Sequence, residues 1–130
     1  MNTMNRIHNI RNPYQGDRIK TLCICSAGLL RSPTLAFVLS QKPYNRNTRA
    51  VGYNQEYALI PLEPIHLAWA DEIFCVDKDS YDAAIAIVKK RNVNIDNIKI
   101  YNLEIPDIYS AFSPELIDEI NLKLDPIGYL

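Results

Sequence analysis

Residues 20–34 read KTLCICSAGLLRSPT, a segment that passes from a strand-like run through a loop into the start of a helix-like run. The first six, Lys20–Cys25, are β-branched or apolar enough to predict a buried strand, and a helix-like run follows from Thr34 to Leu39. Between these two elements the chain must curl ahead of a helix N-terminus, with successive backbone N–H groups pointing inward. Such a concavity attracts anions, so the segment predicts a phosphate cradle with a cysteine, Cys25, at its base.

The residue types in this loop suit phosphoryl chemistry. Inward N–H groups stabilise a thiolate, which makes Cys25 a candidate nucleophile. Arg31 offers a planar fork for two phosphoryl oxygens, and Ser32 can donate a hydrogen bond to the thiolate. Pro33 suits the first helical position, where no N–H is needed. The expected phosphate-binding backbone belongs to Ser26, Ala27, Gly28, Leu29, Leu30 and Arg31.

The loop resembles that of the low-molecular-weight protein tyrosine phosphatases, in which Cys, five residues, Arg, Ser and Pro follow the first strand. The resemblance implies that Cys25 is the nucleophile, Arg31 the phosphate clamp and Ser32 the stabiliser of the thiolate. It also implies a general acid between the last strand and the last helix. The sequence Ile-Pro-Asp-Ile-Tyr at 105–109 lies there, so Asp107 takes that role.

Four positions depart from the family pattern. Ala27-Gly28 stands where the family has Gly-Asn, and Gly28 can still take the left-handed conformation that the curl requires. Leu30 replaces a cysteine that often pairs with the nucleophile, so redox protection by that route is not expected. Cys23, two residues before the nucleophile, is an alternative redox partner or a core residue. Ile108 follows the acid where proline is common.

Length and composition limit the remaining possibilities. With 130 residues, a net charge of −1 and a pI of about 6.1, the chain predicts one domain that binds neither nucleic acid nor membranes broadly. No apolar run reaches membrane-spanning length, and residues 1–6 lack the apolar core of a secretory signal. A thiolate nucleophile needs reducing surroundings, so we expect a cytoplasmic protein. We divide it into an N-terminal arm, 1–18, and a phosphatase domain, 19–130.

Strand-like and helix-like segments alternate, which predicts a doubly wound α/β fold: a four-stranded parallel sheet with helices on both faces. The family resemblance implies strand order 2-1-3-4. Ligands of such sheets bind at the carboxyl ends of the strands, where Cys25 and Asp107 both fall. The expected strands are 20–25, 48–52, 72–76 and 97–101, and the expected helices are 33–41, 62–69, 79–91 and one capped by Ser113 and opened by Pro114.

Several further residues invite either a functional or a structural interpretation. Tyr57 and Tyr109 are candidate walls of a substrate pocket, or ordinary half-exposed aromatics. Asp125 carries the family's Asp-Pro dipeptide but follows the last helix, which favours a helix-exit turn over the role of acid. Cys75 lies mid-strand and is expected to pack, and His66 is expected to be structural. We expect no metal and no cofactor.

These observations predict a cysteine-dependent phosphomonoester hydrolase that acts on a phosphotyrosine-containing protein or a small aryl phosphate. One alternative is a phosphocarrier, because Cys25-Ser26-Ala27-Gly28 also resembles the loop of sugar phosphotransferase IIB components. The loop of those carriers lacks the arginine, so Arg31 and Asp107 favour the phosphatase. An arsenate reductase on the same fold needs further redox cysteines, and a non-catalytic phosphate-binding module would not need the acid. The oligomeric state is left open.

Overall fold

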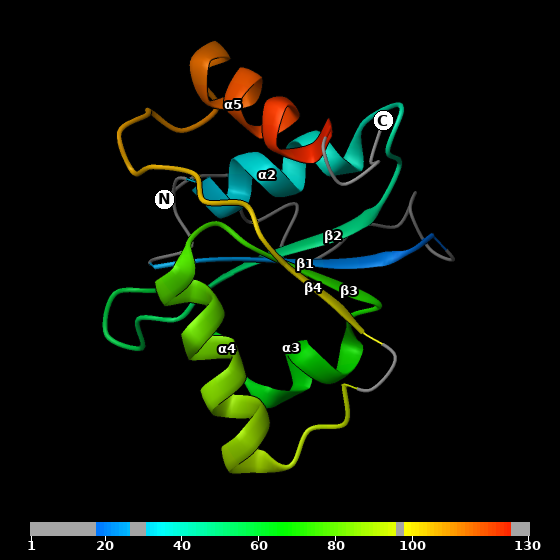
Figure 1. The fold of residues 1–130 in the computed structure, drawn as a ribbon, viewed down its shortest axis with the longest axis vertical. Helices are drawn as coiled ribbons and strands as arrows, with labels where there is room; N and C mark the ends of the chain where they lie inside the picture. The colour runs from blue at the N-terminus through cyan, green and yellow to red at the C-terminus, as the bar shows by residue number, and fades with distance from the viewer. Residues whose placement is uncertain (1–17, 27–30, 96–97, 126–130) are drawn as a thin grey trace.

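The computed structural model describes residues 18–26, 31–95 and 98–125, and within them a four-stranded parallel sheet lies between two layers of helices (Figure 1). The strand order is β2-β1-β3-β4, which confirms the predicted topology. All but the last residue of the predicted arm lies outside the described part of the chain. The elements are β1 (Lys20–Cys25), α2 (Arg31–Ser40), β2 (Asn47–Gly52), α3 (Pro64–Trp69), β3 (Glu72–Cys75), α4 (Lys78–Arg91), β4 (Lys99–Asn102) and α5 (Pro114–Leu124).

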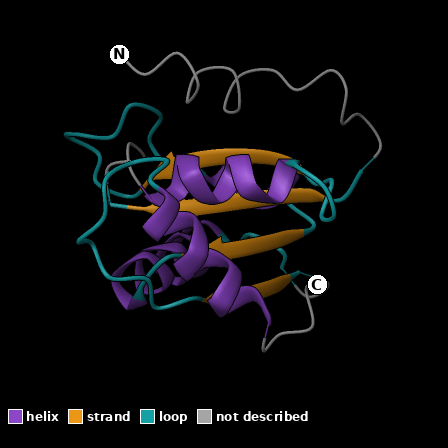
Figure 2. Cartoon of the chain, turned by 90° about the horizontal axis from the view of Figure 1, so that it is seen from above, coloured by secondary structure: helices purple, strands orange, loops and turns teal. Residues whose placement is uncertain are grey.

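The central strand β1 is buried on both faces, as a strand inside a parallel sheet covered by two helical layers must be. Leu22 and Ile24 belong to the core beneath α3 and α4, whereas Cys23 and Cys25 belong to the core beneath α2 and α5. Figure 1 shows α2 and α5 on one side of the sheet and α3 and α4 on the other, and Figure 2, which is seen from above, shows the strands side by side with helices in front of them. Helix α5 turns an apolar stripe toward this core: Leu116, Ile120 and Leu124 are fully buried, and Ile117 is partly buried against the same core.

Helix starts differ most from the sequence prediction. Helix α2 begins at Arg31 rather than at residue 33, so Pro33 is its third residue and not its first. The difference costs no hydrogen bond, since the first four N–H groups of any helix lack a partner inside it. Helix α4 begins at Lys78 behind an Asp77 cap, one residue earlier than predicted. Strand β4 and helix α3 each start two residues later than predicted.

The register of the sheet brings the carboxyl ends of its strands to one edge. Cys25 pairs with Gly52, Ile24 with Cys75, and Cys75 with Asn102. Past these ends the chain keeps contact with its neighbours, because the Tyr53 N–H donates to the Cys25 carbonyl at 2.9 Å. The carboxyl ends of β1, β2, β3 and β4 are therefore neighbours at this edge, where the predicted site falls.

Strand β4 continues beyond its last residue through a kink. The N–H groups of Leu103 and Ile105 donate to the carbonyls of Cys75 and Val76, at 2.8 and 2.6 Å. Glu104, between them, has a φ of 54°, so both flanking side chains turn into the same core. The kink aims the Ile105 carbonyl at the sheet edge. In the described residues no helix is long and apolar enough to cross a membrane.

Candidate active site

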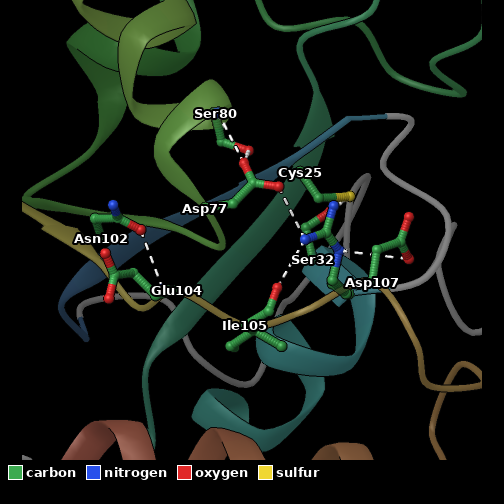
Figure 3. Close-up of polar contacts among 9 residues, drawn as sticks. Cys25, Ser32, Asp77, Ser80, Asn102, Glu104, Ile105 and Asp107 are labelled. Carbon is green, nitrogen blue, oxygen red and sulfur yellow. Dashed lines mark hydrogen bonds and ion pairs between the residues drawn. The ribbon is translucent and has the colours of Figure 1, made fainter.

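The predicted nucleophile and its serine lie in hydrogen-bond contact at the end of β1 (Figure 3). Cys25 Sγ and Ser32 Oγ are 3.0 Å apart, and both side chains are almost fully buried. The Ser32 hydroxyl also lies 3.4 Å from the Val51 carbonyl oxygen. Because a hydroxyl carries one proton, donation to an ionised sulfur takes it away from this longer carbonyl contact. The geometry therefore suits Ser32 as a donor to a Cys25 thiolate.

Four of the predicted phosphate-binding residues, Ala27, Gly28, Leu29 and Leu30, lie outside the described residues. The flanks of the loop are described, and they are anchored. The Ser26 carbonyl accepts a 2.8 Å hydrogen bond from the Asn54 N–H, and the helix that starts at Arg31 is buried through its first six residues. The last described residue before these four and the first described residue after them are therefore both held by the fold.

The Arg31 side chain is buried, at 5% exposure of the residue, and makes polar contacts with three groups. Its Nη1 donates to Asp77 Oδ2 at 2.9 Å and to the Ile105 carbonyl at 2.8 Å. Its Nε lies 3.7 Å from Asp107 Oδ1. A guanidinium has five N–H donors, so with Nη1 engaged, a bidentate grip on a phosphoryl group uses the edge formed by Nε and Nη2.

Asp77 is the residue of this cluster that sequence reasoning missed. It caps α4, because its Oδ1 accepts from the Ser80 N–H at 2.9 Å and from the Ser80 hydroxyl at 2.6 Å, and its Oδ2 binds Arg31 (Figure 3). Burial raises the pKa of the Asp77 carboxyl, but the Ser80 hydrogen bonds and then Arg31 outweigh burial, so its pKa is lowered. The available signal was an aspartate directly after a buried strand, three residues before a serine.

The structure separates the two candidate acids. Asp107 lies beside Arg31 on the loop after β4, and its side chain is 60% exposed, which leaves it open to solvent and substrate. Asp125 stands at the C-terminal cap of α5, where its N–H donates to the Asn121 carbonyl. Asp107 is thus the acid that the fold brings to the Cys25 edge. Its catalytic role remains a prediction.

The two candidate pocket aromatics lie in different settings. Tyr57 is 69% exposed on the loop after β2, which the Asn54 side chain organises by accepting from the N–H groups of Glu56 and Tyr57. Tyr109 is half-buried against the α2 and α5 core. Burial first, and then the neighbouring Glu119 carboxylate, raises the pKa of Tyr109. Tyr57 is therefore open to a ligand, whereas Tyr109 is in part engaged with α5.

The other two cysteines are core residues with poor nucleophilic character. Burial raises the pKa of Cys23 well above its usual range, and it raises the pKa of Cys75 to about 12. Because the thiolate is the attacking form, these raised pKa values disfavour nucleophilic attack by either thiol. The proposed redox role of Cys23 stays a prediction. Across the described ranges, no group of three or more His, Cys, Asp and Glu side chains is arranged to hold a metal ion.

The fold and the site together define a doubly wound parallel α/β domain with a cysteine and a buried arginine at the carboxyl edge of its sheet. Neither a family model nor a curated protein matches the sequence. Among solved structures, a low-molecular-weight phosphotyrosine phosphatase from Vibrio cholerae O395 is similar, with a TM-score of 0.52 and 18% identity over 82% of this chain and 90% of that one. A YwlE mutant from Bacillus subtilis gives a TM-score of 0.47, with 16% identity over 84% of this chain and 90% of that one. The chain therefore shares the fold of the Vibrio phosphatase.

Proposed function

We propose that this chain is a phosphomonoester hydrolase that uses Cys25 as its nucleophile and acts on phosphotyrosine. The observation that carries the proposal is the 3.0 Å contact between Cys25 Sγ and Ser32 Oγ. Ser32 directly follows Arg31 in the sequence, and the Arg31 side chain is buried. A serine hydroxyl can donate a hydrogen bond to an attacking sulfur, and an arginine guanidinium binds an anionic phosphoryl group. The fold shared with the Vibrio cholerae phosphotyrosine phosphatase supports the same proposal of a phosphatase activity.

In the first step the Cys25 thiolate attacks phosphorus in line with the ester bond. A sulfur–phosphorus bond forms as the bond from phosphorus to the phenolic oxygen breaks. The Arg31 edge and the loop N–H groups hold the three equatorial oxygens, and their grip strengthens as charge spreads in the transition state. Asp107 in its protonated form gives its proton to the departing oxygen.

In the second step a water molecule attacks the phosphocysteine. Asp107, now a carboxylate, accepts a proton from this water, the sulfur–phosphorus bond breaks, and inorganic phosphate leaves with the thiolate restored. Asp107 Oδ1 lies 3.7 Å from Arg31 Nε, the atom that a bidentate phosphate would use. We infer that substrate phosphate takes the place of the Asp107 carboxylate at Arg31, which frees the acid for the leaving group.

The test is hydrolysis of an aryl phosphate in the presence of a metal chelator, with wild type and Cys25→Ser compared. We expect turnover by the wild type, none by Cys25→Ser, and competitive inhibition by vanadate. Cys75→Ser is the matched control, since Cys75 lies on the opposite face of the sheet from Cys25. Loss of wild-type activity on chelation, or a Cys25→Ser variant that turns over normally, contradicts the proposal. A phosphocysteine that forms but releases no phosphate identifies a phosphocarrier instead.

A further inference from the structure

The loop between β4 and α5 carries Asp107, and it is attached to α2 at both of its ends. At its start, the Ile105 carbonyl accepts a 2.8 Å hydrogen bond from Arg31 Nη1. At its finish, the Phe112 N–H donates to the Thr34 hydroxyl at 2.9 Å. Residues 106–111, which include the predicted acid, span between these two attachments.

The two attachment points on α2 are neighbours. Arg31 and Thr34 are three residues apart, about one helical turn, so they share one side of the helix. Ser32, the partner of Cys25, belongs to the same turn. The first turn of α2 therefore carries both the group that contacts the nucleophile and the groups that hold the acid loop. Because the same helical turn holds the loop of Asp107 and contacts Cys25, it sets the spacing between that loop and the nucleophile.

The Phe112 attachment is built at some conformational cost. Phe112 has a φ of 59°, a region that a bulky residue rarely occupies. Its ring meets that of Phe37 edge to face, with centroids 5.8 Å apart and an interplanar angle of 79°. Such a backbone conformation persists only where its surroundings hold it, and here the Thr34 hydroxyl and the Phe37 ring do so. Thr34 is fully buried, which shields its hydrogen bond from water.

We propose that Thr34 is a positioning residue: by accepting the Phe112 N–H it fixes the loop that carries Asp107 at the distance proton transfer needs. The inference rests on the proposed function, since it assigns the accuracy of acid catalysis to a residue that touches no substrate. Proton transfer tolerates little misplacement, so a loop released at one end loses acid catalysis before it loses anion binding.

The test compares Thr34→Val, which keeps the shape but removes the hydroxyl, with Thr34→Ser, which keeps the hydroxyl. Each is assayed for kcat/KM with phenyl phosphate and with a highly activated dinitrophenyl phosphate, and for vanadate affinity. Thr48→Val is the matched control. Among the described residues, Thr48 has the buried side-chain oxygen without a hydrogen-bond partner, so this substitution removes a buried hydroxyl and breaks no hydrogen bond. Thermal melting and amide exchange of Phe112 report on folding and on the hydrogen bond itself.

We expect Thr34→Val to lose roughly tenfold in kcat/KM with phenyl phosphate and much less with the activated ester, whose phenolate leaves without a proton. Vanadate affinity stays unchanged, the Phe112 amide loses protection, and Thr34→Ser restores both rate and protection. Equal losses for both esters, weakened vanadate binding, or no loss at all overturn the positioning role. A wild type that hydrolyses neither ester overturns the proposed function instead, while the exchange data still report the hydrogen bond.

Discussion

Replacement of Asp77 by asparagine removes the charge that holds Arg31 while it keeps the cap of α4. Asparagine and aspartate are comparable N-caps, so the hydrogen bonds from Ser80 survive the change. What is lost is the charged partner of the Arg31 Nη1, which lies 2.9 Å away. The variant therefore separates the ion pair from the cap, and Asp77→Ala removes both.

The expected magnitude follows from the exposure of the two side chains. Arg31 is 6% exposed and Asp77 is 30% exposed, so the pair is intermediate between a buried and a surface ion pair. Breaking a buried pair costs about 3–5 kcal/mol, and an exposed one about 0–1 kcal/mol. We expect Asp77→Asn to lower the free energy of unfolding by about 1–3 kcal/mol. Asp77→Ala adds about 1 kcal/mol for the lost cap.

Urea unfolding followed by circular dichroism measures the change at pH 7, with Asp79→Asn as the control. Asp79 carries the same charge in the first turn of the same helix but is exposed, so its loss should cost under about 1 kcal/mol. Because the folded-state pKa of Asp77 is lowered, its stabilisation is full above the unfolded pKa and is lost as the pH falls through the folded value. The difference between wild type and Asp77→Asn should therefore shrink in acid.

Catalysis provides the second assay. An Arg31 guanidinium without its carboxylate keeps its Ile105 contact but loses one of the two acceptors that orient Nη1. We expect Asp77→Asn to lose on the order of tenfold in kcat/KM with an aryl phosphate, with weaker vanadate binding. A variant as stable as wild type at pH 7, or one whose deficit does not shrink in acid, would refute the assignment of Asp77 to the Arg31 charge.

Three further changes probe the site and the fold. Arg31→Lys should lose most activity, because an ammonium lacks the planar two-point grip of a guanidinium. Values of kcat/KM and of vanadate affinity that both stayed near wild type would show that Arg31 does not hold the phosphoryl group. Asp107→Asn should cost on the order of a hundredfold with a poorly activated phenol, while Asp125→Asn should do little; a steeper leaving-group dependence for Asp125→Asn would transfer the role. Burial is the main cause that lowers the pKa of His66, whose Nδ1 accepts from the Glu63 N–H, so stability should fall as the pH drops below the unfolded histidine value near 6.5. Melting curves from pH 7.5 to 5 should show less of this loss in His66→Gln, and equal slopes would exclude the histidine as its source.

Local sequence patterns predicted the strands of the sheet and the nucleophile end of the site, whereas the strand order came from the family resemblance. The run Lys20–Cys25 is strand-like in sequence, and in the structure it is the central strand, buried on both faces. Cys25 and Ser32 are seven residues apart on either side of one turn, so their contact is encoded by a short segment. Ser113 and Pro114 likewise mark the start of α5 without help from the rest of the chain.

The partners of Arg31 were decided by the tertiary structure. Asp77 is 46 residues from Arg31 in sequence and Ile105 is 74 residues away, and no local pattern links them. Sequence periodicity reports which face of an element is buried, but not which loop meets which at the edge of the sheet. From the sequence alone, Asp77 after a strand is explained fully as the N-cap of the next helix. Only the pairing of β1 with β3 brings it to Arg31 and makes it the partner of the guanidinium as well.

The same limit applies to the acid loop. The alternation of strands and helices in the sequence predicts a loop after the fourth strand, and the residues of that loop are acidic and aromatic. Only the fold decided that this loop is tied to α2, through a Thr34–Phe112 bond between residues 78 apart and a backbone φ that no propensity for phenylalanine predicts. Contacts of this kind form because packing brings distant segments together and then favours whatever hydrogen bonds their geometry allows.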